Sequence, residues 1–284
     1  MYFGSVRFFK HLILATVLLI IAGLISAIVW ALLLNMDLRA QIVLLKPVDV
    51  ITKQSECIKY QTLYPNMKAT LPEEYSEDNN TIYLTFDDGP SARTAEILDI
   101  LKEKNVKATF FVTGKTSDAD KAILKRIVAE GHAIGIHTYS HKYSIIYASV
   151  ENYLDDFNKI YTLVYETTGV KADIGRYPGG SINQFNSMIY TEISCEMIRR
   201  GFTYYDWNAS AGDASGSTSK NAVLSNAISS VGSKNRAILL MHDSLSKRHT
   251  VAALPEVIDS LKAKGYTFDK LTNKIRPINF DYKE

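Results

Sequence analysis

The residues best suited to chemistry are two adjacent aspartates, Asp87 and Asp88, which end the β-rich run that starts at Thr81. A Gly89-Pro90 turn follows them directly. In α/β proteins, ligands bind at the rim formed by the carboxyl ends of the parallel strands, so this position puts two carboxylates at a candidate active-site edge. Asp, Gly and Pro are also common turn residues, and this stretch alone fits an ordinary strand-to-turn transition equally well.

Two histidines, His137 and His141, follow another expected strand. Residues four apart share a face where the chain turns helically, which a strand running into a turn permits. Two imidazoles and one carboxylate form a good ligand set for a divalent metal and leave positions for water and substrate. A lone histidine is more often structural, and we expect His11, His132 and His249 to be so.

Polar residues end two further expected strands. The stretch Arg176 to Gly180 is either a turn with a solvent-facing arginine or a functional loop. In the functional interpretation, the arginine pairs with a rim carboxylate, and the Pro-Gly-Gly backbone offers an N–H group to a developing oxyanion. His242 follows an apolar run, where an imidazole suits a proton donor that works near neutral pH.

Short apolar strands alternate with helices from Thr81 onward, which predicts parallel β/α units. The expected strands are Thr81–Phe86, Lys107–Thr113, Ala133–His137, Ala172–Arg176, Phe202–Asn208, Ala237–Met241 and Tyr266–Phe268. The expected helices are Ala92–Lys104, Asp118–Glu130, Val150–Thr167, Ser187–Arg200, Ser219–Val231 and Val251–Lys264. About seven strands are too few for an eight-unit barrel. The sequence therefore predicts a distorted, incomplete (β/α) barrel of the α/β class, with an open sheet as the less favoured alternative.

The polar stretches occur in a diagnostic order along the chain. This ordered set resembles the motifs of the NodB-homology polysaccharide deacetylases, carbohydrate esterase family 4, over roughly residues 80–276. The resemblance implies a distorted (β/α) barrel that hydrolyses acetyl groups from amino sugars or acetylated polysaccharides. It also implies a divalent metal ion, with zinc as the first choice and cobalt or another divalent ion as alternatives. The matching stretches are Thr85–Pro90, His137–His141, Arg176–Gly180, Asp213 and Leu240–Asp243.

The resemblance also implies roles for individual residues. The metal ligands are then Asp88, His137 and His141, and Asp87 is the catalytic base, which Arg176 holds in place. These five residues make up the predicted metal centre and its base.

The remaining implied roles concern the leaving group and the substrate. His242 is the general acid and is oriented by Asp213. The loop residues Tyr177, Pro178 and Gly179 contact the substrate, with the Gly179 backbone as the oxyanion donor. Leu240 lines the pocket for the acetyl methyl group.

The fourth family motif, usually Asp-x-x-Asp-Trp, is altered in this chain. Ser210 stands at the first aspartate and Ala214 at the tryptophan, while Asp213 is kept. One wall of the groove is therefore expected to be more open. Trp207 lies just upstream and is a candidate to replace the missing tryptophan as a substrate contact.

An apolar run from Leu12 to Leu34 dominates the N-terminal part of the chain. As a helix it would span roughly 34 Å, enough to cross a bilayer. A cleaved signal peptide is the alternative, but the run is long for one and no clear cleavage site follows it. Because Arg7 and Lys10 precede the run, the positive-inside rule places the short N-terminus in the cytoplasm. We therefore expect a single-pass membrane protein with an extracytoplasmic catalytic domain.

This interpretation divides the chain into four parts. They are a short cytoplasmic N-terminus with a transmembrane anchor (1–34), an extracytoplasmic stalk (35–79), the deacetylase domain (80–276) and a C-terminal tail (277–284). Cys57 lies in the stalk, and Cys195 is expected to be a buried helix residue. Two cysteines do not make a disulfide framework, and the sequence leaves their pairing open.

Charge and location narrow the choice of partner. The formal net charge is +2, and because Arg7 and Lys10 precede the first acidic residue, Asp37, the rest of the chain is formally neutral. This argues against a nucleic-acid partner. An exported domain faces the cell envelope, so peptidoglycan N-acetylglucosamine is the expected substrate.

Several alternatives stay open. The same chemistry would serve chitin oligomers, another N-acetylated glycan or O-acetylated xylan. An inactive, membrane-tethered glycan-binding or scaffold protein is an alternative of a different class. Some of the 17 tyrosines, including Tyr139, Tyr143, Tyr177, Tyr204 and Tyr205, are expected near the rim, where they could stack on sugar rings. The sequence does not determine the oligomeric state.

Overall fold

The computed structural model describes residues 13–14, 23–26, 29–30, 59–214 and 219–280. The chain divides into two compact units, Met1–Lys59 and Tyr60–Glu284, and the β/α fold belongs to the second. No helix within the described ranges is long and apolar enough to cross a membrane. Most of the predicted span Leu12–Leu34, like Cys57, lies outside these ranges, so the anchor and the four-part division of the chain stay predictions.

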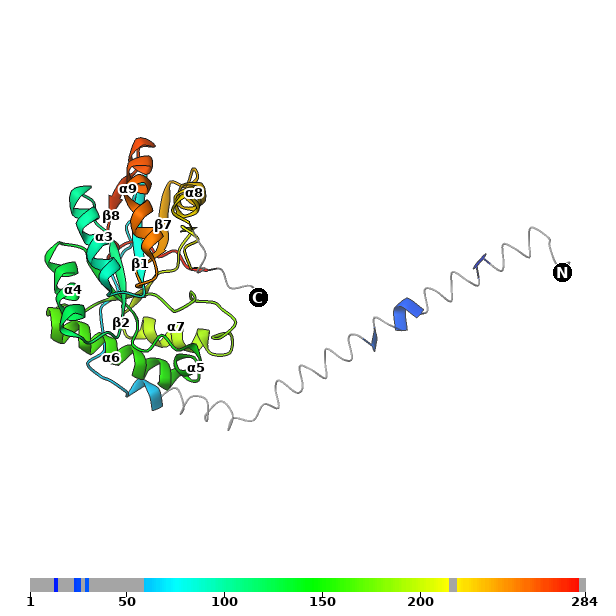
Figure 1. Cartoon of the computed structure of the whole chain (residues 1–284). Coiled ribbons are helices and arrows are strands. Elements are labelled where there is room, and N and C mark those ends of the chain that lie inside the picture. The colour runs from blue at the N-terminus through cyan, green and yellow to red at the C-terminus, as the bar shows by residue number, and fades with distance from the viewer. Residues whose placement is uncertain (1–12, 15–22, 27–28, 31–58, 215–218, 281–284) are drawn as a thin grey trace, which may run out of the picture. The chain divides into compact units, whose positions relative to one another are not determined.

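A curled parallel sheet forms the centre of the second unit (Figure 1). Seven strands follow the order β5-β4-β3-β2-β1-β7-β6, and β8 pairs with β1 beside this path. All of these pairs are parallel. The distorted, incomplete barrel of about seven parallel strands predicted from the sequence is therefore confirmed. The strands are β1 (Thr81–Asp87), β2 (Thr109–Thr113), β3 (Ala133–Thr138), β4 (Ile174–Gly175), β5 (Thr203–Tyr204), β6 (Ala209–Ser210), β7 (Arg236–His242) and β8 (Thr267–Asp269).

The central strand β1 is buried along its whole length. One edge of β1 pairs with β7, while the other pairs first with β8 and then with β2. Alternate side chains of a strand point to opposite faces. Tyr83 accordingly joins a core cluster with Phe111, Ile174 and Ile238, and Thr85 and Asp87 lie further along the same face of β1.

The predicted strand Phe202–Asn208 is wrong in its extent, because only Thr203–Tyr204 of it forms a strand, β5, and a separate short strand, β6, follows at Ala209–Ser210. β5 lies at one end of the strand order beside β4, and β6 lies at the other end beside β7. Between them, Tyr205 N–H donates to Gly175 O at 2.9 Å, and Asn208 N–H donates to Ile238 O at 3.3 Å. Residues 205–208 therefore bridge the gap between the two edges of the incomplete barrel.

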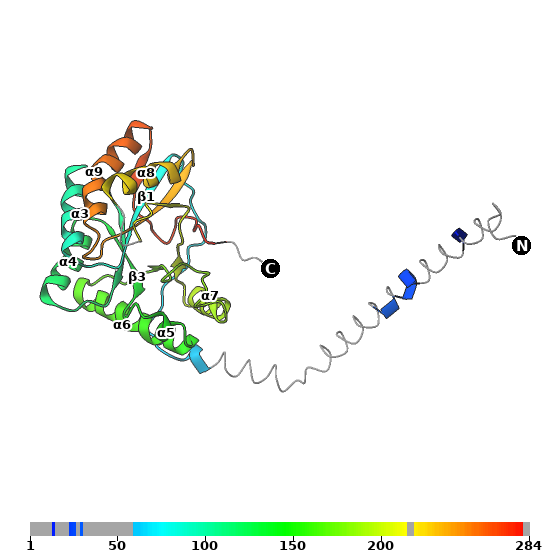
Figure 2. The same cartoon turned by 45° about the vertical axis from the view of Figure 1, so that its right-hand side comes forward.

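Helices cover the outside of the sheet (Figures 1 and 2). They are α3 (Ala92–Glu103), α4 (Asp118–Ala129), α5 (Tyr143–Ile146), α6 (Val150–Thr168), α7 (Tyr190–Arg199), α8 (Lys220–Val231) and α9 (Arg248–Ala263). Several begin at a serine N-cap, and Ser91 and Ser117 form complete capping boxes. The short helix α5 was not predicted. Cys195 on α7 is exposed, so the prediction that it is buried is wrong.

Candidate metal centre and catalytic side chains

Three predicted metal ligands meet at the carboxyl end of the sheet. One potential ligand atom from each of Asp88, His137 and His141 lies within 4.8 Å of the others. The Nε2 atoms of His137 and His141 lie 3.7 and 3.2 Å from Asp88 Oδ1. Asp88 Oδ1 is buried and, among the described residues, has no well-formed hydrogen bond. This arrangement fits a divalent cation, because one carboxylate oxygen and two imidazole nitrogens converge on one point.

Unusual backbone geometry positions all three ligands. Asp88 and His141 have positive φ angles of 78° and 51°, a region that residues other than glycine adopt at a cost in energy. At the third ligand, Val112 pairs with Ile136 but Thr113 pairs with Thr138, so His137 is the extra residue of a bulge in β3. Bulges beside active sites redirect side chains. The structure therefore accepts local irregularity at each ligand position.

Hydrogen bonds and burial suit the two histidines to metal binding. His137 Nδ1 lies 2.7 Å from Arg176 O, so this nitrogen donates to the carbonyl and Nε2 is left as the ligand atom. Burial lowers the pKa of His137, which keeps the imidazole neutral. Contact with Asp88 raises the pKa of His141. A cation at this point would displace the proton that this contact favours.

The predicted base, Asp87, lies beside the ligands and is held by a buried arginine. Arg176 Nη1 donates to Asp87 Oδ1 at 3.0 Å and to Thr85 Oγ1 at 2.7 Å. The same guanidinium donates from Nε to Tyr205 O and from Nη2 to Asp206 O, at 2.9 and 3.0 Å. Arg176 is only 1% exposed. It therefore links the base to the segment that bridges the two sheet edges.

The predicted acid, His242, lies on β7 next to β1 and is bound by Asp213. His242 Nδ1 lies 2.8 Å from Asp213 Oδ1, and His242 N–H donates to Asp213 Oδ2 at 2.9 Å. Burial lowers the pKa of His242, but the hydrogen bond and charge of Asp213 raise it more, so the net shift is upward. Since Nδ1 is engaged, Nε2 is the nitrogen available for proton transfer.

The residues predicted to contact the substrate are either exposed, as Gly179 is, or almost fully buried, as Tyr177 and Leu240 are. Gly179 is exposed with a φ of 79°, and its N–H has no acceptor in the part of the chain that the structure describes. Its neighbour Pro178 accepts through its carbonyl from Tyr147 O–H at 2.7 Å, which fixes the loop. Tyr177 and Leu240 are 3% and 6% exposed.

Trp207 and the remaining rim tyrosines do not form a wall of exposed aromatic rings, because they are buried or half-buried. Trp207 is half-buried. Its ring centroid lies 4.9 Å from that of Phe280 and 5.7 Å from the Arg176 guanidinium. Tyr177, Tyr204 and Tyr205 are buried, so the expectation that they stack on sugar rings is wrong. Tyr143 is half-buried and its ring packs against His141 and Phe185. The ring also lies next to Gly179, because a Cβ added to that glycine would be 3.1 Å from it.

Asp156 of α6 supports the metal centre and was missed in the sequence. Its buried carboxylate accepts from Thr138 Oγ1, from Tyr139 N–H at 2.6 Å and from Ser140 N–H at 2.9 Å. These three residues form the link between His137 and His141. The signal was available, because a charged residue stands on the otherwise apolar inner face of an amphipathic helix.

Asp243 supports the aspartate pair from the opposite side. Its N–H donates to Asp87 O at 3.0 Å, and its Oδ2 accepts from Thr94 Oγ1 at 2.6 Å. A Cβ at Gly89 would lie 2.2 Å from Asp243 Oδ2, so only glycine fits there. Burial raises the pKa of Asp243 to about 7. The aspartate follows His242 in the sequence, but its role depends on this packing.

The fold and the site define an α/β domain with a candidate divalent-metal site, and comparison with known proteins identifies its family. A sequence profile described as polysaccharide deacetylase matches residues 74–193. A putative polysaccharide deacetylase of Bacillus subtilis (strain 168), YheN, is 32% identical over 250 residues, 86% of each chain. The chain therefore belongs to the polysaccharide deacetylase family.

Two relatives carry a more specific description. A peptidoglycan-N-acetylglucosamine deacetylase of Bacillus cereus is 30% identical over 247 residues, covering 82% of this chain and 86% of its own. The second relative is the catalytic domain of a peptidoglycan N-acetylglucosamine deacetylase from Eubacterium rectale, known from its crystal structure, whose sequence is 37% identical to this chain. It superimposes with a TM-score of 0.70 over 78% of this chain and all of that domain.

Proposed function

We propose that the protein removes acetyl groups from an N-acetylated cell-envelope polysaccharide, with peptidoglycan N-acetylglucosamine as substrate. One observation carries the proposal: the carboxylate of Asp87 is held by Arg176 beside the cluster of Asp88, His137 and His141. Both deacetylase relatives described above support the choice of polymer. An inactive binder is less well supported, because it has no need of a positioned base and acid.

Asp88 and the two histidines would hold the cation. Zinc is our first choice for this cation, and cobalt is an alternative. When bound, it would supply a Lewis acid that polarises the acetyl carbonyl and lowers the pKa of water. The protein's own groups do the remaining work. Asp87 accepts the proton of the attacking water, and Arg176 keeps its carboxylate in place.

The developing oxyanion and the leaving amine also need stabilisation. The N–H group of Gly179 would donate to the oxyanion, and one such donor is typically worth roughly 3–4 kcal/mol of barrier. His242 donates a proton to the departing nitrogen while Asp213 holds its ring. A positioned acid or base usually contributes about 10²–10⁴-fold. Tyr143 and Phe185 form an aromatic edge next to His141 that would contact the sugar rings.

The substrate is tested by measuring acetate release by the full-length protein. Intact N-acetylated peptidoglycan, chitin oligomers and acetylated xylan are compared in parallel, with and without a chelator. We expect the highest rate on peptidoglycan and its loss in chelator. Full activity in chelator would exclude the metal-dependent mechanism, and a preference for xylan would replace the proposed substrate.

The cellular location is a separate proposal. The apolar run Leu12–Leu34, preceded by Arg7 and Lys10, would anchor the chain with the catalytic domain outside the membrane. Cell fractionation checks this, because a chain truncated at about residue 35 should move from the membrane to the soluble fraction. Equal membrane association of both forms would contradict a single anchor at this position.

A further inference from the structure

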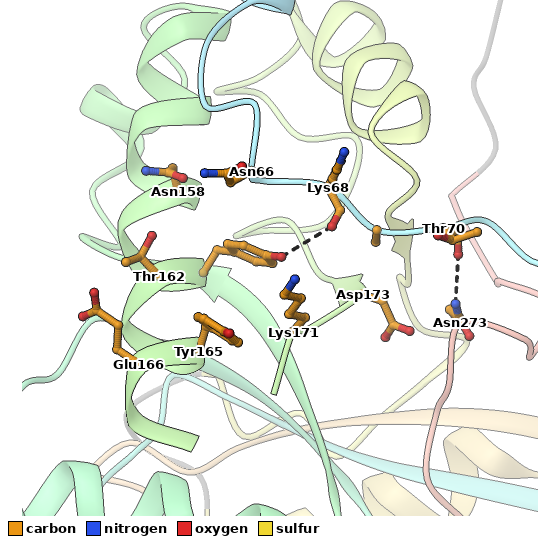
Figure 3. A pocket seen from close by; sticks show the side chains of 12 residues that line it. Asn66, Lys68, Thr70, Asn158, Thr162, Tyr165, Glu166, Lys171, Asp173 and Asn273 are labelled. Atoms are coloured by element: carbon orange, nitrogen blue, oxygen red, sulfur yellow. Dashed lines mark hydrogen bonds between the residues drawn. The ribbon is translucent and has the colours of Figure 1, made fainter. Parts of the chain in front are cut away.

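A polar hollow of about 940 Å³ lies beside α6 and the start of β4 (Figure 3). We define it by Asn66, Asn158, Thr162, Tyr165, Lys171 and Asp173, all of which line it. Figure 3 shows that these side chains come from a loop before the sheet, from α6 and from the segment that leads into β4. None of the residues assigned to the metal centre lines the polar hollow.

Long-range contacts fix the wall formed by residues 66–70. Three hydrogen bonds join Tyr161 O–H to Lys68 O at 3.4 Å, Ala69 N–H to Arg200 O at 2.8 Å, and Asn273 Nδ2 to Thr70 O at 3.0 Å. At Gly201, whose φ is +87°, a Cβ would lie 2.2 Å from Ala69 O, so glycine permits the close approach. The polar hollow is therefore preformed, which reduces the entropy lost when a ligand binds.

The polar hollow offers hydrogen-bonding groups that the protein itself does not use. Within the described part of the chain, the side chains of Asn66, Asn158 and Thr162 have no hydrogen-bond partner. Tyr165 is 46% exposed, and Lys171 Nζ lies 5.6 Å from its ring centroid. Amide and hydroxyl groups thus surround one accessible aromatic ring.

The charges of the polar hollow are balanced. Lys68 and Lys171 stand against Glu166 and Asp173. A polyanion would require a surplus of positive charge, and an apolar partner would require more exposed apolar surface than one ring provides. Neutral sugars match the lining better, because their hydroxyl and amide groups hydrogen-bond while their apolar faces stack on an aromatic ring.

A second hollow, of about 480 Å³, lies along α6 beside the polar hollow. Both hollows are lined by Asn158, Thr162 and Glu166, which lie four residues apart on one stripe of α6. The second hollow extends to Tyr139, whose N–H is bound by Asp156 in the link between the two histidine ligands. The two hollows therefore share one stripe of α6, and the second reaches the segment between the two histidine ligands.

We propose that the polar hollow is a second glycan-binding site, which holds a neutral segment of the polymer whose acetyl group is removed at the metal centre. This inference rests on the proposed function, because it takes the ligand class from the substrate. Binding one polymer chain at two places raises its effective concentration at the metal centre without any new catalytic contact.

The test is cosedimentation of the full-length protein with insoluble N-acetylated peptidoglycan. The variants are Tyr165→Ala and Asn158→Ala, whose side chains are at least partly exposed, and the matched control is Tyr75→Ala, which removes an exposed tyrosine that does not line the polar hollow. We expect both variants to weaken binding about three- to tenfold, the range of one aromatic or polar contact, and the control to bind as wild type. On short N-acetylglucosamine oligomers, kcat/KM should stay unchanged in all three.

Three outcomes would overturn the proposal: wild-type cosedimentation of both variants, an equal loss in the Tyr75→Ala control, or a parallel loss of kcat/KM on the short oligomers. The last would mean that the substitution acts on the metal centre. Failure of the proposed function is distinguishable, because it would appear as absence of acetate release by wild type. Cosedimentation does not depend on turnover.

Discussion

Asp87 and His242 are paired residues in the register of the adjacent parallel strands β1 and β7. Neighbouring strands lie about 4.8 Å apart, and paired residues project to the same face. Asp243 N–H, which donates to Asp87 O at 3.0 Å, continues the pairing by one residue. The sheet itself therefore fixes the distance between the proposed base and the proposed acid.

Asp87→Asn should abolish the base without disturbing the metal centre. Asn keeps the shape of the side chain, and Asp87 is not one of the three converging ligands. We expect acetate release to fall by about 10²–10⁴-fold. Elemental analysis should give the same metal content as wild type. Wild-type turnover in this variant would remove Asp87 from its role.

Asp213→Asn should move the alkaline side of the pH–rate profile to lower pH. The carboxylate raises the pKa of His242 above what burial alone would give. A general acid must be protonated, so the rate falls as pH rises through that pKa, and loss of the carboxylate lowers the pKa. The profile of kcat/KM from about pH 5 to about pH 10 measures the shift.

Thr250→Val serves as its control, because Thr250 Oγ1 donates to Asp213 Oδ2 at 2.7 Å and its removal keeps the carboxylate. This variant should retain most of the wild-type alkaline limb. An alkaline limb that does not move in Asp213→Asn would show that another group is the acid.

Asp156→Asn should weaken metal binding while leaving the fold intact. The carboxylate accepts three hydrogen bonds from residues 138–140, and an amide cannot accept all three with equal strength. Loss of such a supporting group typically costs 10–100-fold in metal affinity, so a drop of about that size is expected. Competition with a metal indicator measures it.

The neighbouring Asp155→Asn is the matched control. Asp155 pairs with Lys159 on the surface of α6 at 2.6 Å, and such pairs contribute little to stability. Metal affinity in this variant should equal that of wild type. If the two variants lose affinity equally, the effect belongs to α6 as a whole and Asp156 has no special role.

Gly89→Ala should destabilise the domain through a steric clash. A Cβ at this position would lie 2.2 Å from Asp243 Oδ2, and overpacking of a buried site typically costs about 1–3 kcal/mol. Urea unfolding of the full-length protein measures the loss. The double variant Gly89→Ala/Asp243→Ala should be less destabilised than the sum of the two single variants. Strict additivity would show that the two residues do not clash.

Much of the fold follows from local patterns in the sequence. β-rich runs such as 81–86 predict strands. Serines such as Ser91 and Ser219 mark helix starts, which the structure places within one residue of the predicted positions. Alternation of the two element types dictates a parallel sheet, in which all carboxyl ends lie at one edge. For this reason the sequence alone could bring Asp87, Asp88, His137, Arg176 and His242 to one rim.

Tertiary contacts decided the features that depend on residues far apart in the chain. The bulge at His137 and the left-handed backbone at Asp88 and His141 are no part of a regular strand or turn pattern. They persist because partners distant in sequence hold them, as Asp156 holds the link between the two histidines. The placement of β5 and β6 at opposite ends of the strand order likewise depends on which edges the closing barrel leaves unpaired. Local sequence determines the backbone conformation that each segment prefers. Only the packed chain determines which of these preferences are overruled, because the free energy that overrules them comes from long-range contacts.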